Sequence, residues 1–130
     1  MIEPAIIDTN TFIFSNHFKV SQKLNNYRTL FGFVNMSIIT YEDIINKMNY
    51  GGFKHLLNRS KAYLNFNQVI PISKEIRQLA NSLAHEQNNL SYADLLVAAT
   101  ALKHNLVLIT NKKQAYQQIQ GLKTDTWSLF

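Results

Sequence analysis

The sequence predicts an α/β protein with a parallel central sheet of about five strands and helices on both of its faces. Short apolar runs alternate along the chain with longer segments in which apolar residues recur every three or four positions, as on one face of a helix. Strands and helices that alternate in this way form parallel sheets covered on both sides. No repeat, low-complexity tract or Pro/Gly-rich linker divides the sequence, so residues 1–130 are expected to form a single domain.

The strands and helices follow one another in a regular order. Apolar runs predict strands at residues 4–7, 36–39, 69–72, 106–109 and 122–126. Helical spacing predicts helices at 9–16, 19–33, 40–50, from the Gly51-Gly52 break to about 65, 73–86 and 91–104, with a short helix after residue 111. The helix over 91–104 is apolar nearly all round, so we expect it at the centre of the molecule.

The charge balance is compatible with a polyanionic substrate. The chain has 13 Lys and Arg residues against 8 Asp and Glu, a net charge of +5. Four of the acids, Asp8, Glu42, Asp43 and Asp94, are expected to converge on one site. The rest of the chain is therefore strongly basic, which suits an approach through phosphate groups. Many basic proteins bind no nucleic acid, so charge alone does not decide the function.

The sequence predicts a soluble cytoplasmic protein. It contains no cysteine, which excludes disulfides and thiolate metal sites and suits a reducing compartment. The first residues have no basic segment followed by a long apolar run, as a secretory signal would. No apolar stretch approaches the length that a membrane-spanning helix needs.

Acidic residues stand at the starts of three predicted helices. Asp8 directly follows the first strand, and Glu42 and Asp43 come shortly after the second. Thr40-Tyr41-Glu42-Asp43 and Ser91-Tyr92-Ala93-Asp94 both match the capping box, in which a hydroxyl and an acid satisfy the first N–H groups of a helix. Asp8 is likewise a common N-cap residue. Taken singly, each motif is the ordinary signal of a helix start.

The three acidic positions together indicate a metal site. Two of them follow strands whose carboxyl ends should meet at one edge of the sheet, where ligands of such folds bind. Grouped carboxylates repel one another, and a divalent cation removes that cost. Oxygen ligands without cysteine suit Mg²⁺ or Mn²⁺ better than zinc. The histidines share no metal-ligand spacing and are interpreted as surface or capping residues; they are His17, His55, His85 and His104.

Five segments of the chain resemble the signature segments of PIN-domain ribonucleases, and most of all the VapC-type toxins of toxin–antitoxin pairs. They are residues 6–10 (IIDTN), 37–43 (SIITYED), 92–101 (YADLLVAATA), 108–111 (LITN) and 121–123 (GLK). The resemblance implies a PIN-like three-layer fold and an acid cluster that binds Mg²⁺ or Mn²⁺. It also implies endonucleolytic cleavage of RNA by metal-activated water, a homodimer, and a cognate antitoxin that blocks the site.

The resemblance assigns the acids. Asp8, Asp43 and Asp94 match the catalytic, metal-binding positions. Family members usually carry Glu three residues after the Thr that matches Thr40, and here that residue is Asp43. The neighbouring Glu42 is therefore kept as its alternate.

Residues near the fourth strand depart from the family pattern. The family usually places Asp or Asn two residues after the Thr that matches Thr110, and this chain has Lys112 there. Either Asn111 serves in place of the missing acid, or the Lys112 ammonium occupies its position. A cation there would argue against a second metal ion and would weaken catalysis.

Other residues have proposed supporting roles. Asn10 and Thr110 are expected to orient carboxylates and water, although Thr110 is equally well explained as a helix N-cap. Lys112 and Lys113 are candidates to contact the RNA backbone, and so are four basic residues on the two middle helices, Lys47, Lys54, Arg59 and Lys61. A solvated helix face is the commoner role of such lysines. Aromatic residues are frequent in the first third of the chain, and any that are exposed would suit a dimer or antitoxin surface.

Three other functions remain open at this stage. One is a catalytically impaired PIN-fold module that binds RNA or a partner, and another is an RNA-processing nuclease without an antitoxin. The third is an unrelated doubly wound phosphate-binding protein, such as a response-regulator-like receiver. No strand–acid–Thr–Lys arrangement of the receiver kind is apparent, and no Gly-rich phosphate loop is present.

Overall fold

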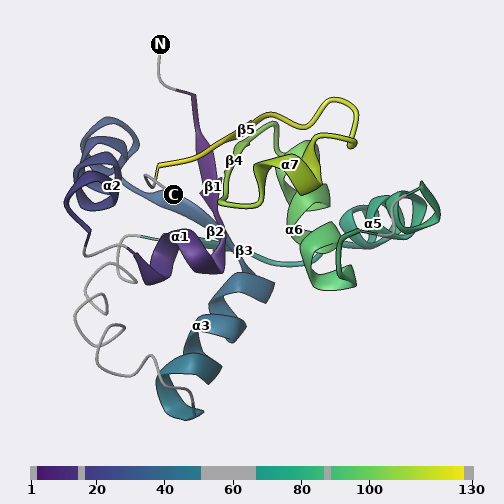
Figure 1. The fold of residues 1–130 in the computed structure, drawn as a ribbon, viewed down its shortest axis with the longest axis horizontal. Helices are drawn as coiled ribbons and strands as arrows, with labels where there is room; N and C mark the ends of the chain where they lie inside the picture. Colours follow the sequence, from purple (N-terminus) through teal and green to yellow (C-terminus); the bar gives the residue numbers. More distant parts are fainter. Residues whose placement is uncertain (1–2, 15–16, 51–66, 87–88, 128–130) are drawn as a thin grey trace.

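The computed structural model describes residues 3–14, 17–50, 67–86 and 89–127, which form a five-stranded parallel sheet with helices on both faces (Figure 1). The strand order is β3-β2-β1-β4-β5, and every neighbouring pair is parallel. The strands are β1 (Ala5–Ile7), β2 (Val34–Ser37), β3 (Asn67–Ile70), β4 (Val107–Ile109) and β5 (Thr124–Asp125). The predicted fold class and its five parallel strands are confirmed.

The described helices follow the strands as expected. They are α1 (Thr9–Ile13), α2 (Phe18–Phe31), α3 (Ile38–Tyr50), α5 (Lys74–Glu86), α6 (Tyr92–Lys103) and α7 (Lys113–Tyr116). Gly32 ends α2 in the left-handed conformation (φ 82°), and its N–H donates to the carbonyl of Arg28. No described helix is long and apolar enough to span a bilayer.

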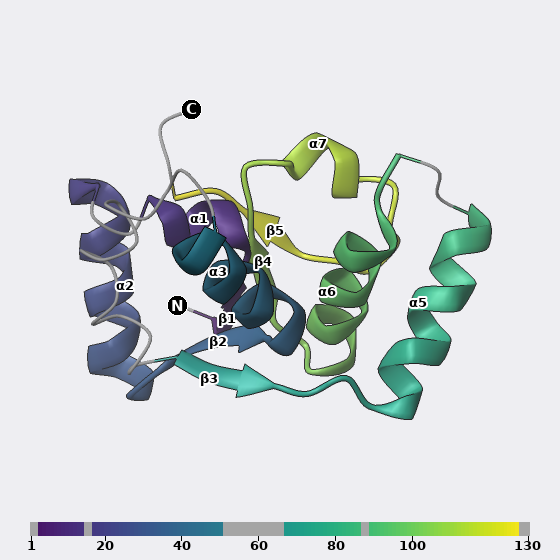
Figure 2. The ribbon, with the colours of Figure 1, turned by 90° about the horizontal axis from the view of Figure 1, so that it is seen from below.

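Two hydrophobic cores lie on opposite faces of the sheet. Ile6 and Leu108 pack with α5, α6 and Tyr116 of α7. Their strand neighbours Ile7 and Ile109 pack with α1, α2 and α3 on the other face. Because successive strand residues point to opposite faces, one short strand serves both cores. Figure 2 shows the resulting layers, with α5 and α6 on one side of the strands and α1, α2 and α3 on the other.

Helix α6 is the buried helix that the sequence predicts. All residues from Leu95 to Ala101 are buried, and the helix packs closely against α5. The Ser91 hydroxyl oxygen accepts a hydrogen bond from the N–H of Asp94 (3.1 Å), so the predicted hydroxyl cap at this helix start is confirmed. The apolar body of α6 therefore fixes the position of its acidic first turn.

The boundary between β2 and α3 differs from the prediction. The strand ends at Ser37, and the helix begins at Ile38 instead of Thr40. The Ser37 hydroxyl oxygen accepts from the N–H of Ile39 (3.2 Å), and Thr40 is buried within the helix. The interpretation of Thr40 and Asp43 as a capping box was therefore wrong, since a serine earlier in the chain begins the helix.

Strand β3 also lies two residues earlier than predicted, at Asn67–Ile70. Pro71 follows the strand directly and lacks the N–H group that would continue the ladder. The predicted helix over 51–65, with its basic residues Lys54, Arg59 and Lys61, lies outside the described residues, and so does His55.

Candidate functional site

Asp8 lies at the carboxyl end of β1, the central strand of the sheet. Its N–H donates to the carbonyl oxygen of Ile109 (3.2 Å), and its Oδ1 accepts from the N–H of Thr11 (2.9 Å). The Thr11 hydroxyl also donates to the Ile109 carbonyl (3.1 Å), which links the first turn of α1 to β4. Asp8 is thus a true N-cap, and it is held almost buried at the place where the sheet is expected to bind a ligand.

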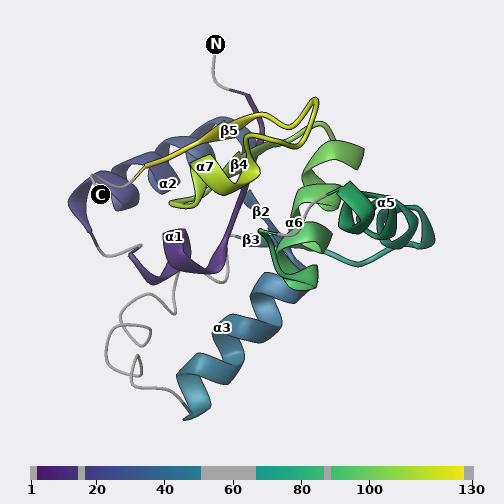
Figure 3. The ribbon, with the colours of Figure 1, turned by 45° about the vertical axis from the view of Figure 1, so that its right-hand side comes forward.

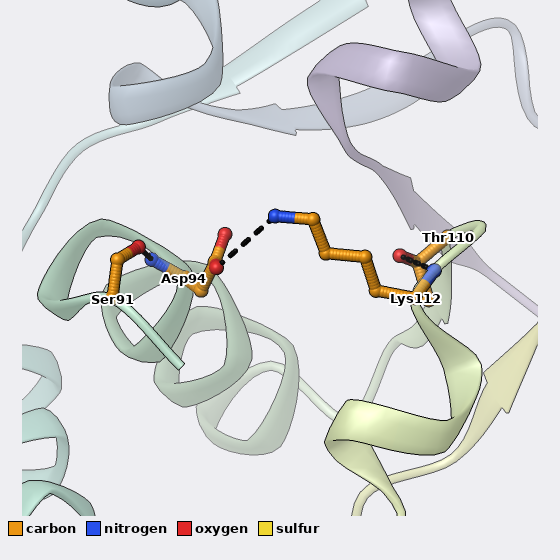
Figure 4. Close-up of polar contacts among 4 residues, drawn as sticks. All are labelled: Ser91, Asp94, Thr110 and Lys112. Carbon is orange, nitrogen blue, oxygen red and sulfur yellow. Dashed lines mark hydrogen bonds and ion pairs between the residues drawn. The ribbon is translucent and has the colours of Figure 1, made fainter. Parts of the chain in front are cut away.

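Asp94 stands in the first turn of α6 and carries a lysine counter-ion. Its Oδ2 atom lies 3.3 Å from Nζ of Lys112, which comes from the loop after β4 (Figure 4). The Asp94 side chain is 24% exposed and that of Lys112 is 47% exposed. Lys112 therefore reaches across to the head of α6 while much of its side chain remains in solvent.

Asp8 and Asp94 line one cleft of about 480 Å³ together with residues of α3. Figure 3 shows the first turns of α1, α3 and α6 gathered at the same edge of the sheet. The lining residues are Asp8, Thr9, Asn10, Ile39, Thr40, Glu42, Asp43, Asn46, Lys47, Ser91, Ala93, Asp94, Val97, Lys112 and Tyr116. All four acids singled out from the sequence are present, as are Asn10 and Lys112.

The α3 wall of the cleft presents two adjacent acids. Oδ1 of Asp43 lies 3.6 Å from Nζ of Lys47, one turn further along the helix. Glu42 is exposed and also borders a smaller neighbouring cavity with Tyr41, whereas Asp43 is partly buried. Asn46 and Lys47 were not assigned to the acid cluster from the sequence. Their spacing of four residues from Glu42 and Asp43 is the signal that places them on the same wall.

Tyr116 is a site residue that the sequence analysis missed. Its side chain is fully buried between α7 and the sheet, yet it borders the cleft. Burial raises the pKa of the Tyr116 phenol above its ordinary range, and the nearby carboxylates of Asp94 and Asp8 and a hydrogen bond to Asp94 raise it further. The Tyr116 phenol therefore remains protonated in the folded protein, near both carboxylates.

Thr110 and Asn111 support the loop that carries Lys112. The fully buried Thr110 hydroxyl oxygen accepts from the backbone N–H of Lys112 (2.9 Å). Asn111 Oδ1 accepts from the Thr126 hydroxyl (3.1 Å), beside β5. Thr110, Asn111 and Lys113 are not among the residues that line the cleft. Thr110 is also not the N-cap of α7, which is Lys112 and has no side-chain cap bond.

The donors in the cleft fit a hard divalent cation in kind. They are carboxylate, amide and hydroxyl oxygens, and the described histidines, His17, His85 and His104, lie at the surface. Within the described parts of the chain, however, no three Asp, Glu or His side chains lie close enough together to hold a metal ion. Two of the acids instead contact lysines, Asp94 with Lys112 and Asp43 with Lys47.

The fold and the site define a class: a small parallel α/β protein with an acidic cleft at the carboxyl edge of its sheet. Residues 5–119 match the family described as PIN domain. The chain belongs to the PIN-domain family.

Solved structures of similar fold come from toxin–antitoxin systems. DNA-bound VapBC from Salmonella typhimurium matches with a TM-score of 0.79 at 18% identity, covering 98% of this chain and 100% of that one. A toxin–antitoxin complex from Klebsiella pneumoniae matches with a TM-score of 0.66 at 28% identity, covering 91% of this chain and 94% of that one. VapBC-1 from nontypeable Haemophilus influenzae matches with a TM-score of 0.68 at 23% identity, covering 95% and 97%. No curated protein matches the chain.

Proposed function

We propose that this protein is a Mg²⁺- or Mn²⁺-dependent endoribonuclease and the toxin of a toxin–antitoxin pair. The observation that carries the proposal is that Asp8 and Asp94, which are distant in the sequence, line one cleft at the carboxyl edge of the sheet. These acids come from the central strand and the central helix, and further acids of α3 line the same cleft. Such an arrangement at the carboxyl edge of a parallel sheet suits a metal-assisted hydrolase.

The acids would hold one divalent cation. Asp8, Asp94 and Asp43 are the proposed ligands, directly or through water, with Glu42 as the alternate for Asp43. When bound, the metal lowers the pKa of a water molecule and stabilises the negative charge that develops on the phosphate during hydrolysis.

The remaining residues of the cleft position these acids and the substrate. The Thr11 N–H donates to one oxygen of Asp8, and the buried Tyr116 phenol borders the cleft beside Asp94. Asn10 lines the cleft beside Asp8 and orients carboxylate and water. Thr110 acts through the backbone of Lys112, while Lys112 and Lys113 would bind the RNA phosphates.

The antitoxin and dimer assignments rest on the family and on the solved structures. One similar chain comes from a toxin–antitoxin complex, and others come from structures of VapBC and of FitAcB. Phe18, Leu30 and Phe33, on or just after α2, are exposed apolar residues of the kind that a dimer or antitoxin contact buries. We propose a homodimer in the cytoplasm, held inactive by a cognate antitoxin.

A second function is favoured by the contact between Lys112 and Asp94. A cation on a proposed metal-binding acid is the arrangement expected of a PIN-fold module that binds RNA or a partner without cleaving it. A nuclease that processes RNA without an antitoxin is distinguished genetically, because no antitoxin reading frame would adjoin its gene.

Incubation of the purified protein with single-stranded RNA tests the proposal. Cleavage is expected with Mg²⁺ or Mn²⁺, and none is expected with EDTA or in Asp94→Asn. RNA binding without cleavage in any metal would instead establish the binding module. Cleavage that persists in both EDTA and Asp94→Asn would refute the metal mechanism.

A further inference from the structure

Lys112 has a backbone hydrogen bond to a buried side chain, and its own side chain reaches across the cleft. Its N–H is held by the buried Thr110 hydroxyl at 2.9 Å, directly after β4. Its ammonium lies 3.3 Å from Oδ2 of Asp94 on α6 (Figure 4). The next residue, Lys113, does not line the cleft. The geometry thus directs one particular lysine to a proposed metal ligand.

The ammonium and a divalent cation compete for the same carboxylate. The Lys112 ammonium compensates the negative charge of Asp94, whose carboxylate lines the same cleft as that of Asp8. A metal ion held by Asp94 supplies that compensation itself and repels the ammonium. Since an exposed ion pair contributes little stability, the Lys112 side chain can leave Asp94 at small cost.

The Thr110 hydroxyl hydrogen-bonds the backbone of Lys112 beside the cleft, so a released ammonium can still reach the other groups of the cleft. The freed ammonium of Lys112 can then pair with another anion. The proposed RNA substrate would bring a phosphate group into the cleft. We propose that Lys112 exchanges partners: it pairs with Asp94 in the metal-free protein and moves to an RNA phosphate when the metal binds. The inference rests on the proposed nuclease function and deepens it, since it makes metal and RNA binding cooperative through one side chain.

The test measures binding and does not depend on activity. Mn²⁺ affinity is measured by calorimetry, and RNA affinity by fluorescence anisotropy with a phosphorothioate-substituted oligonucleotide, which keeps the backbone charge and resists hydrolysis. In the wild type, Mn²⁺ is expected to strengthen RNA binding. Lys112→Gln should bind Mn²⁺ more tightly, by roughly 3- to 10-fold for the removal of one screened charge. In this variant Mn²⁺ should improve RNA binding much less than in the wild type.

Two further variants serve as controls. Lys103→Gln removes the same charge from the last turn of α6, about 14 Å along the helix from Asp94, beyond the screening length at physiological salt. It should behave as the wild type in both measurements. Lys112→Arg keeps the charge and should retain the coupling between Mn²⁺ and RNA binding.

The outcomes separate the exchange from the nuclease function. Equal Mn²⁺ affinities in Lys112→Gln and wild type, in a protein that cleaves RNA, would overturn the exchange alone. Tighter Mn²⁺ binding and lost coupling in Lys112→Gln, with no cleavage by the wild type, would support the exchange and overturn the nuclease. Absence of Mn²⁺ binding in both proteins would overturn both.

Discussion

Asp43 and Lys47 form an ion pair of 3.6 Å across one turn of α3, on the wall of the cleft that faces Asp94. The pair places a second lysine beside a second proposed metal ligand. Two of the acids that line the cleft are therefore each paired with a lysine that also lines it.

The adjacent acids of α3 can be told apart by matched amide substitutions. Asp43→Asn is expected to weaken Mn²⁺ binding by about 10-fold or more and to abolish most cleavage, because an amide supplies no negative charge to the metal. Glu42→Gln should change Mn²⁺ affinity and cleavage much less, since Glu42 is exposed and also borders a neighbouring cavity. Calorimetry measures the Mn²⁺ affinity of both variants, and a cleavage assay measures their activity. A larger loss in Glu42→Gln would transfer the ligand role to Glu42.

Asp8 combines a structural and a catalytic role, which two substitutions separate. Asp8→Asn keeps an oxygen for the Thr11 N–H, so the free energy of unfolding should stay the same or rise as carboxylate repulsion falls. Cleavage should nevertheless be lost. Asp8→Ala should lose both activity and about 1 kcal/mol of stability, the usual value of an N-cap. Urea unfolding and RNA cleavage report the two effects. Full activity in Asp8→Asn would show that Asp8 is only a cap.

Removal of the Tyr116 hydroxyl should cost stability and activity together. Tyr116→Phe deletes a donor to the Asp94 carboxylate, and a hydrogen bond to a charged group contributes about 1.5–3 kcal/mol. Cleavage should fall because Asp94 is no longer held in place. Tyr92→Phe is the matched control, since it deletes only an exposed hydrogen bond to Asn81. Similar unfolding midpoints and activities for the two variants would contradict the assigned role of Tyr116.

A divalent metal should stabilise the wild type. At Mg²⁺ or Mn²⁺ concentrations well above Kd, ligand linkage predicts a gain of roughly 1–3 kcal/mol in unfolding free energy. The gain should shrink in Asp94→Asn, which has one charged ligand fewer. Thermal melting in EDTA and in each metal gives the shift in melting temperature. A melting temperature that no metal changes would count against the site.

Stability should decline in alkaline solution through the buried tyrosines. Burial raises the pKa of Tyr27, and the nearby carboxylates of Asp125 and Glu3 raise it further. The unfolded chain therefore loses this proton first, so stability is intact below about pH 10 and falls as the pH rises toward the folded-state pKa. Tyr27→Phe should show a smaller decline in urea unfolding as the pH is raised above about 10. An unchanged slope would show that Tyr27 ionises with its ordinary pKa.

The sequence predicted the fold class and the placing of the four acids along one cleft, because both depend on patterns that every parallel α/β sheet shares. The apolar helix beginning near Ser91 and the strand before Asp8 place two acids without knowledge of tertiary contacts. The start of α3 was misplaced because Ile38 and Ile39 are β-branched and favour a strand, whereas the Ser37 hydroxyl begins a helix at that point.

The finer features of the site depend on contacts between distant segments. The identity of Lys112 is visible in the sequence, but its contact with Asp94, 18 positions away, requires the loop geometry set by Thr110. Tyr116 gave no sequence signal beyond an aromatic residue in a short helix. Its role arises from burial beside two carboxylates, which only the folded arrangement provides.

The central position of β1 in the sheet has a consequence for hydrogen exchange. β1 pairs with β2 on one side and with β4 on the other, while β3 and β5 form the edges. Edge strands can open locally without disturbing the middle, so the amide protons of Ile7 and Asp8 should exchange with solvent only when the whole sheet opens. The acid at the end of β1 is thus the part of the site that local opening of the sheet edges disturbs least.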